Sequence, residues 1–398
     1  MFYKRNYSDY ILRNIEFYPI ITLCGARQTG KTTLLKETFP EFNYVSLDLP
    51  STAETAERNP DEFFKTYPAP LIIDEVQYAP GLFRHLKRLV DRDRHTMGQY
   101  ILTGSQKFNL MKEVSDSLAG RSLILDLENL SWQEISRQRQ EKLSLDIQST
   151  LMTRGQFPEL WRVPKMPSGG FYASYLASYL ERDVRQILNV TSLRDFERFI
   201  RALAPRSGQL LNKTDLARDV GVSVKAINDW LSVLQASNQI VLLEPWFQNI
   251  AKRVVKSPKV YFCDSGLLSF LLGVSNENLN DSPFKGQIWE TLVFSELRKI
   301  NYTAKTPVNF WFYRDQTARE IDFVIEKGGV ISLAECKWTE NPQSSDIKTL
   351  TSIDAELRKK EGPYRAGEHY LICNSADTYP LSPGIDVISL DRLDKIWN

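Results

Sequence analysis

The stretch ITLCGARQTGKTTLL (residues 21–35) decides the first part of the fold. It joins an apolar run, a turn bounded by glycines, and a run that is predicted to be helical and to end before Pro40. The turn fits G-x-x-x-x-G-K-[ST] without a gap, from Gly25 to Thr32. Gly25 and Gly30 allow the backbone N–H groups to turn inward, and the following helix points its positive end at the same place. The stretch therefore predicts a strand, a phosphate-binding loop and a helix.

The side chains of this loop indicate that the phosphates belong to ATP bound with Mg²⁺. Lys31 is placed to reach the β and γ phosphates, and the Thr32 hydroxyl is placed to ligate Mg²⁺. A glycine-rich turn without a ligand is the structural alternative, and the uninterrupted order of strand, turn and helix disfavours it. The predicted nucleotide-binding residues are Gly25, Ala26, Arg27, Gln28, Thr29, Gly30, Lys31, Thr32 and Thr33.

A pair of acids follows the next apolar run, in APLIIDEVQYAP (residues 69–80). The predicted strand Leu71–Ile73 ends in Asp74 and Glu75. Asp74 is predicted to hold Mg²⁺ through its water shell, as a Walker B carboxylate does. Glu75 is predicted to polarise the attacking water, a role worth ~10²–10⁴ in rate. Small-molecule kinases do not need this glutamate, so the pair favours hydrolysis; an acidic strand end at a turn is the alternative.

Further polar side chains are predicted to reach the γ-phosphate. Ser105 ends the predicted strand QYILTGS (residues 99–105), where it could sense that phosphate, although a plain glycine turn is nearly as well supported. Arg121 is the first candidate for an arginine that acts on a neighbouring subunit, a role worth ~10³–10⁵ in rate. Its rivals lie in YLERDVRQI, where ion pairs with Glu181 and Asp183 are their alternative role: Arg182 and Arg185.

The middle of the chain reads as helices followed by a winged helix-turn-helix. Residues 171–205 show helical spacing of Tyr and Leu. In the next segment Thr214 is predicted to cap one helix, Gly221 to make the turn and Ser223 to cap a second helix, before the wing strand QIVLLEPW. DNA contact through the second helix and a purely structural role are equally supported.

A local basic run, AKRVVKSPK (residues 251–259), is the better candidate for contacts with nucleic-acid phosphates, because the whole chain has a net charge of only +1. A strand edge protected by lysines is its alternative. Its cations are Lys252, Arg253, Lys256 and Lys259.

Carboxylates gather in the C-terminal part. The predicted helix at residues 284–300 carries Glu290, and strands follow in NFWFYR, REIDFVIE and VISLAECKW. Neighbouring antiparallel strands could bring Asp322 and Glu335 together, where two carboxylates can hold Mg²⁺ or Mn²⁺. Lys337 lies on the same face as Glu335 and could orient a water molecule. An ion cluster without catalysis, or a nuclease-like fold that only binds, is the alternative.

The bulk composition narrows the setting. With 398 residues the chain is long enough for two or three domains. No apolar run approaches the ~18–20 residues that a membrane-spanning helix needs, and MFYKRNYSDYIL lacks the apolar segment of a signal peptide. The four cysteines have neither zinc-site nor disulfide spacing, and a cytoplasmic protein with free thiols is expected.

The order of these motifs resembles the AAA+ class of ATPases. It looks in particular like the bacterial and archaeal AAA-type ATPases that carry an uncharacterised nuclease-like C-terminal domain. The resemblance covers most of the chain and implies a helical lid, ATP and Mg²⁺ as cofactors, and a hexamer-like ring of identical subunits. The matching phrases are GARQTGKTTLL, LIIDEVQ, LTGS, SLAGR, YLERDV, KVYFCDSGLLSFLLG and EIDFVIE…AECK.

The C-terminal pattern Glu…Asp…Glu-x-Lys resembles the restriction-endonuclease-like, Holliday-junction-resolvase-like nucleases. This resemblance implies that Asp322 and Glu335 are metal ligands, that Lys337 is the catalytic lysine and that Glu290 assists them. Ile321 stands where some relatives have proline.

The predicted fold is therefore α/β in three parts. Residues 1–170 form the P-loop AAA+ core, residues 171–250 the helical lid and winged helix, and residues 251–398 a small restriction-endonuclease-like domain. One predicted function is an ATP-hydrolysing oligomer that acts on DNA with a nuclease. The other is an ATP-switched scaffold whose C-terminal domain binds a protein or DNA without cleavage.

Overall fold

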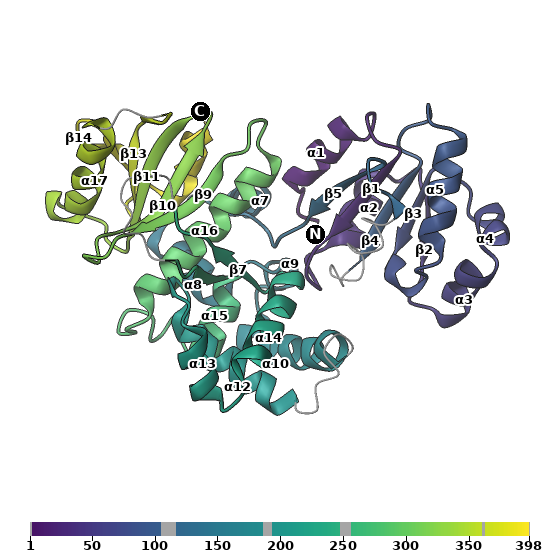
Figure 1. Ribbon diagram of the computed structural model, residues 1–398, viewed down its shortest axis with the longest axis horizontal. Coiled ribbons are helices and arrows are strands. Elements are labelled where there is room, and N and C mark those ends of the chain that lie inside the picture. Colours follow the sequence, from purple (N-terminus) through teal and green to yellow (C-terminus); the bar gives the residue numbers. More distant parts are fainter. Residues whose placement is uncertain (1, 105–116, 186–192, 247–255, 360–362, 398) are drawn as a thin grey trace. The chain divides into compact units, whose positions relative to one another are not determined.

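The computed structural model describes residues 2–104, 117–185, 193–246, 256–359 and 363–397 (Figure 1). The chain divides into two compact units, whose borders differ from the predicted borders at residues 170 and 250. The division into three parts stays a prediction. The first unit comprises Met1–Leu130, Phe157–Arg162 and Ala236–Asn238, and the second comprises Ser131–Gln156, Val163–Gln235 and Gln239–Asn398.

The first unit is built on five parallel strands in the spatial order β2-β3-β4-β1-β5. Every residue of β1, β3 and β4 is buried, which explains why these strands are continuous apolar runs rather than alternating ones. The predicted strands at β1 and β3 are confirmed. The bounds are β1 Ile20–Cys24, β2 Asn43–Ser46, β3 Leu71–Asp74, β4 Tyr100–Gly104 and β5 Ser122–Asp126.

Helices accompany this sheet, and Figure 1 shows it among α1, α2 and α5. Leu82, Phe83 and Leu86 of α5 share one apolar core with Ile73 of β3 and Leu102 of β4. The helices are α1 Asn6–Asn14, α2 Lys31–Thr38, α3 Pro50–Arg58, α4 Pro60–Thr66, the 3₁₀ turn Val76–Tyr78, α5 Leu82–Arg92 and α9 Pro158–Arg162.

The register of the strands brings the important loops together. Cys24 at the end of β1 lies beside Gly104 at the end of β4, and Ile73 of β3 lies beside Leu102 of the same strand. The carboxyl ends of β1, β3 and β4 therefore meet at one edge of the sheet. Open α/β sheets bind their ligands at such an edge.

The second unit begins with helices and contains the helix-turn-helix. Gly221 has φ +80° at the end of the first helix, as a left-handed turn requires, and the Ser223 hydroxyl accepts a hydrogen bond from the Ala226 N–H at 3.1 Å. The prediction that Thr214 caps the first helix is wrong, because the Asn212 side chain accepts from the backbone there. The helices are α7 Trp132–Arg139, α8 Leu145–Arg154, α10 Ser168–Tyr179, the π turn Leu180–Val184, α12 Leu193–Leu203, the 3₁₀ turn Ala204–Arg206, α13 Lys213–Val220, α14 Val224–Ala236 and α15 Ser265–Leu272.

A small antiparallel sheet completes the helix-turn-helix region. Its order is β6-β8-β7, with β6 at Gln209–Leu210, β7 at Ile240–Leu243 and β8 at Lys259–Phe262. The predicted border between residues 250 and 251 therefore falls between two paired strands. The strand β8, which was assigned to the nuclease-like domain, pairs with the predicted wing strand instead.

The rest of the second unit is a seven-stranded sheet in the order β14-β15-β13-β11-β10-β9, with β12 beside β11. The strands β9, β10 and β11 are antiparallel, whereas β11, β13 and β15 run parallel. The predicted helix at 284–300 and the three strands after it are present. The bounds are α16 Lys285–Thr303, β9 Asn309–Arg314, β10 Glu320–Lys327, β11 Val330–Lys337, the 3₁₀ turn Ser344–Ile347, α17 Lys348–Lys359, β12 Arg365–Ala366, β13 His369–Cys373, β14 Tyr379–Ser382, β15 Ile385–Ile388 and the 3₁₀ segment Leu390–Trp397.

Candidate functional site

The loop between β1 and α2 has the backbone of a phosphate cradle. Gly25 has φ +151° and Gly30 has φ +89°, and both values lie where side chains are strained. A Cβ atom on Gly25 would lie 2.4 Å from the Leu127 carbonyl oxygen, so this position also lacks space for a side chain. The helix α2 starts at Lys31, directly after Gly30, and its N-terminal N–H groups face the loop.

Lys31 is buried within this loop. Its ammonium donates hydrogen bonds to the Gly25 carbonyl at 3.0 Å and to the Ala26 carbonyl at 2.9 Å. Burial lowers the pKa of Lys31, and the charges of Glu75 and Asp74 oppose that shift only in part. The ammonium thus rests on neutral carbonyls in a poorly solvated place, where an anion would favour its charged form.

Three hydroxyl groups converge on Asp74. Its Oδ2 accepts from Thr32 Oγ1 at 2.7 Å and from Tyr44 Oη at 2.8 Å, and its Oδ1 accepts from Thr103 Oγ1. Hard oxygen donors of this kind are what Mg²⁺ prefers, and it binds proteins through one or two side chains plus phosphates and water. The predicted pair of Thr32 and Asp74 fits a Mg²⁺ ion that arrives with a nucleotide.

Glu75 follows Asp74 in an unusual conformation. Its φ of 54° and ψ of 46° place a non-glycine residue in the left-handed region, which costs of order 1 kcal/mol and is found at functional sites. Its half-buried carboxylate accepts a hydrogen bond from Gln77 Nε2. Hydrogen bonding to Gln77 fixes a carboxylate beside the loop that carries Lys31.

Arg5 is a part of this site that the sequence did not reveal. Its side chain is buried, and its guanidinium donates to the Thr29 carbonyl at 2.8 Å, to the Glu128 carbonyl at 2.6 Å and to the Asn129 carbonyl at 3.1 Å. It therefore ties the phosphate loop to the segment after β5. Arg5 and Tyr44 lie outside every motif, so no spacing rule pointed to them, whereas Thr103 belongs to the phrase LTGS, in which Ser105 was preferred.

Of the other residues predicted near the γ-phosphate, the structure describes the side chains of Arg121 and Arg185, and each of them pairs with an acid. Ser105 lies outside the described residues. Arg121 makes a bidentate ion pair with Asp91, at 2.7 and 3.0 Å, and it precedes β5 at the opposite end of the sheet from the loop. Arg185 pairs with Glu181 at 2.7 Å on the helix surface, and the side chain of Arg182 is not described.

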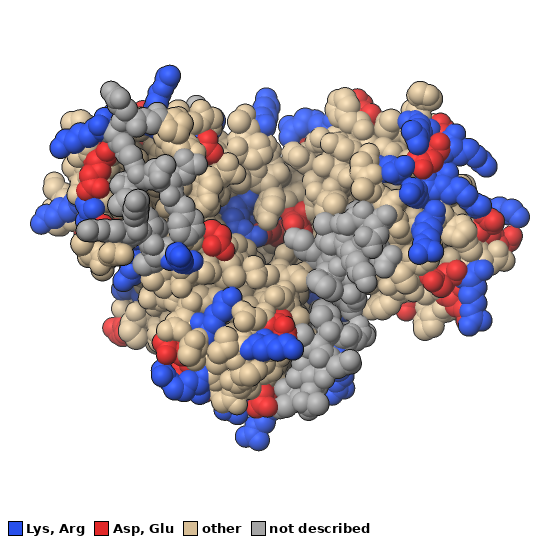
Figure 2. All heavy atoms as spheres, in the orientation of Figure 1, with Lys and Arg blue, Asp and Glu red and all other residues tan. Residues whose placement is uncertain are grey.

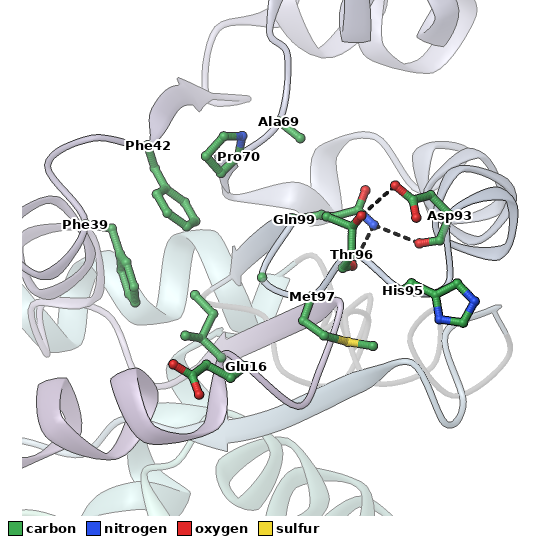
Figure 3. Close-up of a pocket in the computed structure, with 12 residues that line it drawn as sticks. Glu16, Phe39, Phe42, Ala69, Pro70, Asp93, His95, Thr96, Met97 and Gln99 are labelled. Atoms are coloured by element: carbon green, nitrogen blue, oxygen red, sulfur yellow. Dashed lines mark hydrogen bonds between the residues drawn. The ribbon is translucent and has the colours of Figure 1, made fainter.

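A separate pocket lies at the amino ends of the strands. Figure 3 shows Phe39, Phe42, Pro70, Met97 and Gln99 around it, close to where β3 and β4 begin. The loop that carries Lys31 follows the carboxyl end of β1, so this pocket is not the nucleotide site. Its lining combines apolar side chains with the polar side chains of Glu16, Asp93, His95, Thr96 and Gln99.

The predicted carboxylates of the second unit do come together. Phe323 of β10 lies opposite Ala334 of β11, so Asp322 lies opposite Glu335, as the sequence predicted. Burial and the charge of Asp322 raise the pKa of Glu335 to about 9, and burial raises the pKa of Glu290 to about 7. Lys337, the predicted catalytic lysine, is half-exposed, with its ammonium 3.8 Å from Glu335.

A lysine that was not predicted here lies among these acids. The ammonium of Lys259 is 3.2 Å from Glu290 Oε1, 2.6 Å from Glu320 Oε1 and 3.3 Å from Asp322 Oδ1. Its side chain is only 1% exposed. Among the described residues, no group of three or more His, Cys, Asp and Glu side chains is arranged to hold a metal ion. The residues present therefore do not fit the predicted divalent metal.

The cations of the predicted basic run at residues 251–259 do not all lie on the surface. Lys259 was counted in the patch at residues 251–259, but it is buried against carboxylates and cannot meet a phosphate. Lys256 is exposed, while Lys252 and Arg253 lie outside the described residues. In Figure 2 Lys and Arg side chains gather instead over α5 of the first unit, where the exposed cations are Arg84, Lys87, Arg88 and Arg92.

Two findings complete the setting. Within the part of the chain that the structure describes, no helix is both long enough and apolar enough to cross a membrane. The four cysteines are free; three are buried and Cys263 is half-buried.

Comparison with protein families gives three matches along the chain. Residues 18–136 match the AAA domain family, residues 146–278 match a domain of unknown function, and residues 285–393 match another domain of unknown function. The match over residues 18–136 supports the predicted P-loop ATPase domain of the AAA type. The matches to the second unit assign no activity to it.

Two relatives match most of the chain, and both bear the name uncharacterized protein. The uncharacterized protein Rv2008c of Mycobacterium tuberculosis is 29% identical over 395 residues, which cover 98% of this chain and 84% of that protein. The uncharacterized protein MJ1544 of Methanocaldococcus jannaschii is 23% identical over 367 residues, covering 85% of this chain and 79% of the relative. Similarity over nearly the full length indicates that the ATPase domain and the second unit occur together in other proteins.

Solved structures resemble the chain only distantly. A Walker-type ATPase of Pyrococcus abyssi superposes with a TM-score of 0.45 at 15% identity, covering 68% of this chain and 96% of that one. RuvB of Thermotoga maritima superposes with a TM-score of 0.29 at 13% identity, covering 59% of this chain and 85% of that one. Likeness at this level supports no argument about function.

Proposed function

We propose that the first unit binds ATP with Mg²⁺ and hydrolyses it to ADP and phosphate. The observation that carries the proposal is the 2.7 Å contact between the Thr32 hydroxyl and Asp74, because it joins the two predicted Mg²⁺ groups at the helix end of a phosphate loop. When bound, Mg²⁺ would neutralise negative charge on the phosphate oxygens. Lys31 would leave its two carbonyl partners for the β and γ phosphates, while Thr32 and Asp74 would hold the metal.

Glu75 would act on the attacking water. Its carboxylate lies one residue beyond Asp74, and Gln77 fixes its orientation. In this position it would accept the water proton as the nucleophile attacks the γ-phosphorus. Tyr44 and Thr103 would keep Asp74 oriented through their hydrogen bonds, so the chain needs no further acid to build the hydrolytic centre.

The test is phosphate release by the purified full chain and by Glu75→Gln. This variant should bind ATP with unchanged affinity and lose ~10²–10⁴ of the hydrolysis rate. Glu41→Gln, which changes an exposed glutamate of the same unit, is the matched control and should hydrolyse ATP like the wild type. Wild-type protein that retains no adenine nucleotide, or Glu75→Gln that hydrolyses it normally, would contradict the proposal.

We further propose that ATP binding drives assembly of identical subunits into a ring that acts on DNA. The resemblance to AAA+ proteins supports the ring, and the exposed cations of α5 offer a surface for phosphates. Arg121 would have to leave Asp91 to act on a neighbouring subunit. Light scattering of Glu75→Gln with and without ATP tests assembly; an unchanged mass excludes a nucleotide-driven ring.

A second candidate concerns what the ATP cycle controls. The scaffold alternative, in which the C-terminal region binds a protein or DNA without cutting it, is favoured by one observation: the Lys259 ammonium lies where the predicted nuclease needs a metal. Incubation of the wild type with single-stranded, duplex and branched DNA, ATP and Mn²⁺ tests it. Cleavage that Asp322→Ala abolishes would restore the nuclease prediction for Asp322, Glu335 and Lys337.

A further inference from the structure

Three carboxylates of the second unit contact one ammonium, a fourth lies beside one of them, and we call the four the carboxylate cluster. They come from different elements: Glu290 from α16, Glu320 and Asp322 from β10, and Glu335 from β11. Lys259 enters from β8, a strand of the small sheet, so tertiary packing rather than local sequence brings it to the acids. A buried lysine with three carboxylate contacts is a built feature, because an unpaired ammonium there would be strongly disfavoured.

The distances decide what the cluster can hold. The Lys259 ammonium lies 2.6–3.3 Å from an oxygen of each of three carboxylates. A Mg²⁺ ion bound by the same oxygens would need them at roughly 2.0–2.1 Å, which would put the ion almost on top of the ammonium. Two cations that close repel each other strongly in a poorly solvated place. The lysine and a divalent ion therefore exclude each other.

Further hydrogen bonds and an ion pair hold the three acids that contact the lysine, and one of them shares an oxygen with Lys259. Tyr261, from the same strand, donates its hydroxyl to Glu290 Oε1. Arg314 pairs with Glu320 Oε2 at 2.6 Å, and the Cys336 N–H donates to Asp322 Oδ2 at 2.9 Å. Each of these three acids thus has one oxygen turned to Lys259 and a further hydrogen-bond donor from the protein.

We propose that the Lys259 ammonium takes the place of a divalent cation in the carboxylate cluster, and that removing it uncovers a site for Mn²⁺ or Mg²⁺. The inference rests on the second candidate function, the scaffold that does not cleave, and is independent of ATP hydrolysis. It explains why the acids persist in a region without a metal-ready arrangement: they bind a cation that the chain itself supplies.

The test compares four full-length proteins after treatment with EDTA and without nucleotide, and the single variant Asp322→Asn is a fifth protein that is compared with the wild type. Lys259→Met keeps the length of the side chain and removes its charge. Lys256→Met, three residues away and exposed, is the matched control. Lys259→Met/Asp322→Asn removes the predicted metal ligand as well. Free Mn²⁺ is measured by electron paramagnetic resonance, and the midpoint of thermal unfolding is measured with and without Mn²⁺; any weak binding at Asp74 is common to all four.

Lys259→Met should bind one more equivalent of Mn²⁺ than the wild type, and Mn²⁺ should raise its unfolding temperature. Wild type and Lys256→Met should show neither effect, and the double variant should lose both. If the wild type binds an equivalent of Mn²⁺ that Asp322→Asn does not bind, the inference is wrong. This comparison tests the inference even if Lys259→Met does not fold. A folded Lys259→Met protein that binds no extra equivalent of Mn²⁺ would also overturn the inference. This result would not contradict the proposal that the C-terminal region binds without cleaving.

Discussion

Two buried lysines in this chain have opposite surroundings. Lys31, in the first unit, donates hydrogen bonds to two backbone carbonyls, and burial lowers its pKa although the charges of Glu75 and Asp74 act against that shift. Lys259, in the second unit, contacts three carboxylates, and their charges raise its pKa well above the usual range despite its burial. The first ammonium is kept for an anion that comes from outside, whereas the second is already neutralised. The charge of the neighbours, rather than the residue type, separates a binding site from a closed ion cluster.

The largest expected effect is the loss of stability on removing the second lysine. Lys259→Ala would leave one buried and two partly buried carboxylates without their cation, and breaking a buried ion pair in this way typically costs about 3–5 kcal/mol. The free energy of unfolding in urea should fall by this amount. The folded fraction of the variant should hydrolyse ATP at the wild-type rate. A loss below about 1 kcal/mol would show that the carboxylates are well solvated, and the contrast between the two lysines would fail.

The reverse result is expected for the first lysine. Lys31→Ala should lower ATP hydrolysis by ~10²–10³, because the cation that stabilises the transferred phosphate is gone. Its stability without nucleotide should stay the same or rise, because a poorly solvated charge is removed. Parallel measurements of phosphate release and of urea unfolding check both parts; Lys65→Ala, at an exposed lysine of the same unit, is the control.

A smaller effect is expected at Tyr44, which holds the predicted Mg²⁺ ligand Asp74. Tyr44→Phe removes one hydrogen bond to a carboxylate, worth about 1.5–3 kcal/mol when the acceptor is charged, and leaves the ring in place. The Mg²⁺ concentration needed for half-maximal hydrolysis should rise several-fold, with a smaller change in the maximal rate. Tyr10→Phe, in α1, should leave the Mg²⁺ dependence unchanged.

The smallest effect concerns a buried base that stays neutral. His369 Nδ1 accepts the Leu333 N–H at 3.0 Å, and burial lowers the pKa of His369 below 6.5. The unfolded chain therefore takes up the proton first, so stability present above about pH 6.5 is lost as the pH falls. Urea unfolding between pH 7.5 and pH 5.5 should show this slope, and His369→Gln should reduce it. An unchanged slope in the variant would assign the pH dependence to other groups.

Contiguous patterns predicted the first unit well. The phosphate loop and the acids at the end of β3 lie in short local motifs, and the residues within each motif are fixed relative to one another by the strand, turn and helix that carry them. Alternation along β10 and β11 also placed Asp322 opposite Glu335, since a hairpin register depends on nearby residues.

The missed residues have one cause in common. Lys259 lies 31 residues before Glu290 and 63 before Asp322, and only the packing of β8 on the larger sheet brings it to the acids. Arg5 reaches carbonyls more than a hundred residues away for the same reason. Local composition made Lys259 look like part of a basic surface, and no spacing within the sequence contradicts that interpretation.

The buried guanidinium of Arg5 also sets the limits of any smaller ATP-binding piece. The family match begins at residue 18 and the first strand begins at Ile20. The phosphate loop, however, is held by a hydrogen bond from Arg5, which precedes both. A fragment that begins at Ile20 would contain every residue of the phosphate-loop motif but would lack the hydrogen bond from Arg5 to the Thr29 carbonyl. A fragment that keeps this contact to the phosphate loop must therefore start no later than residue 5.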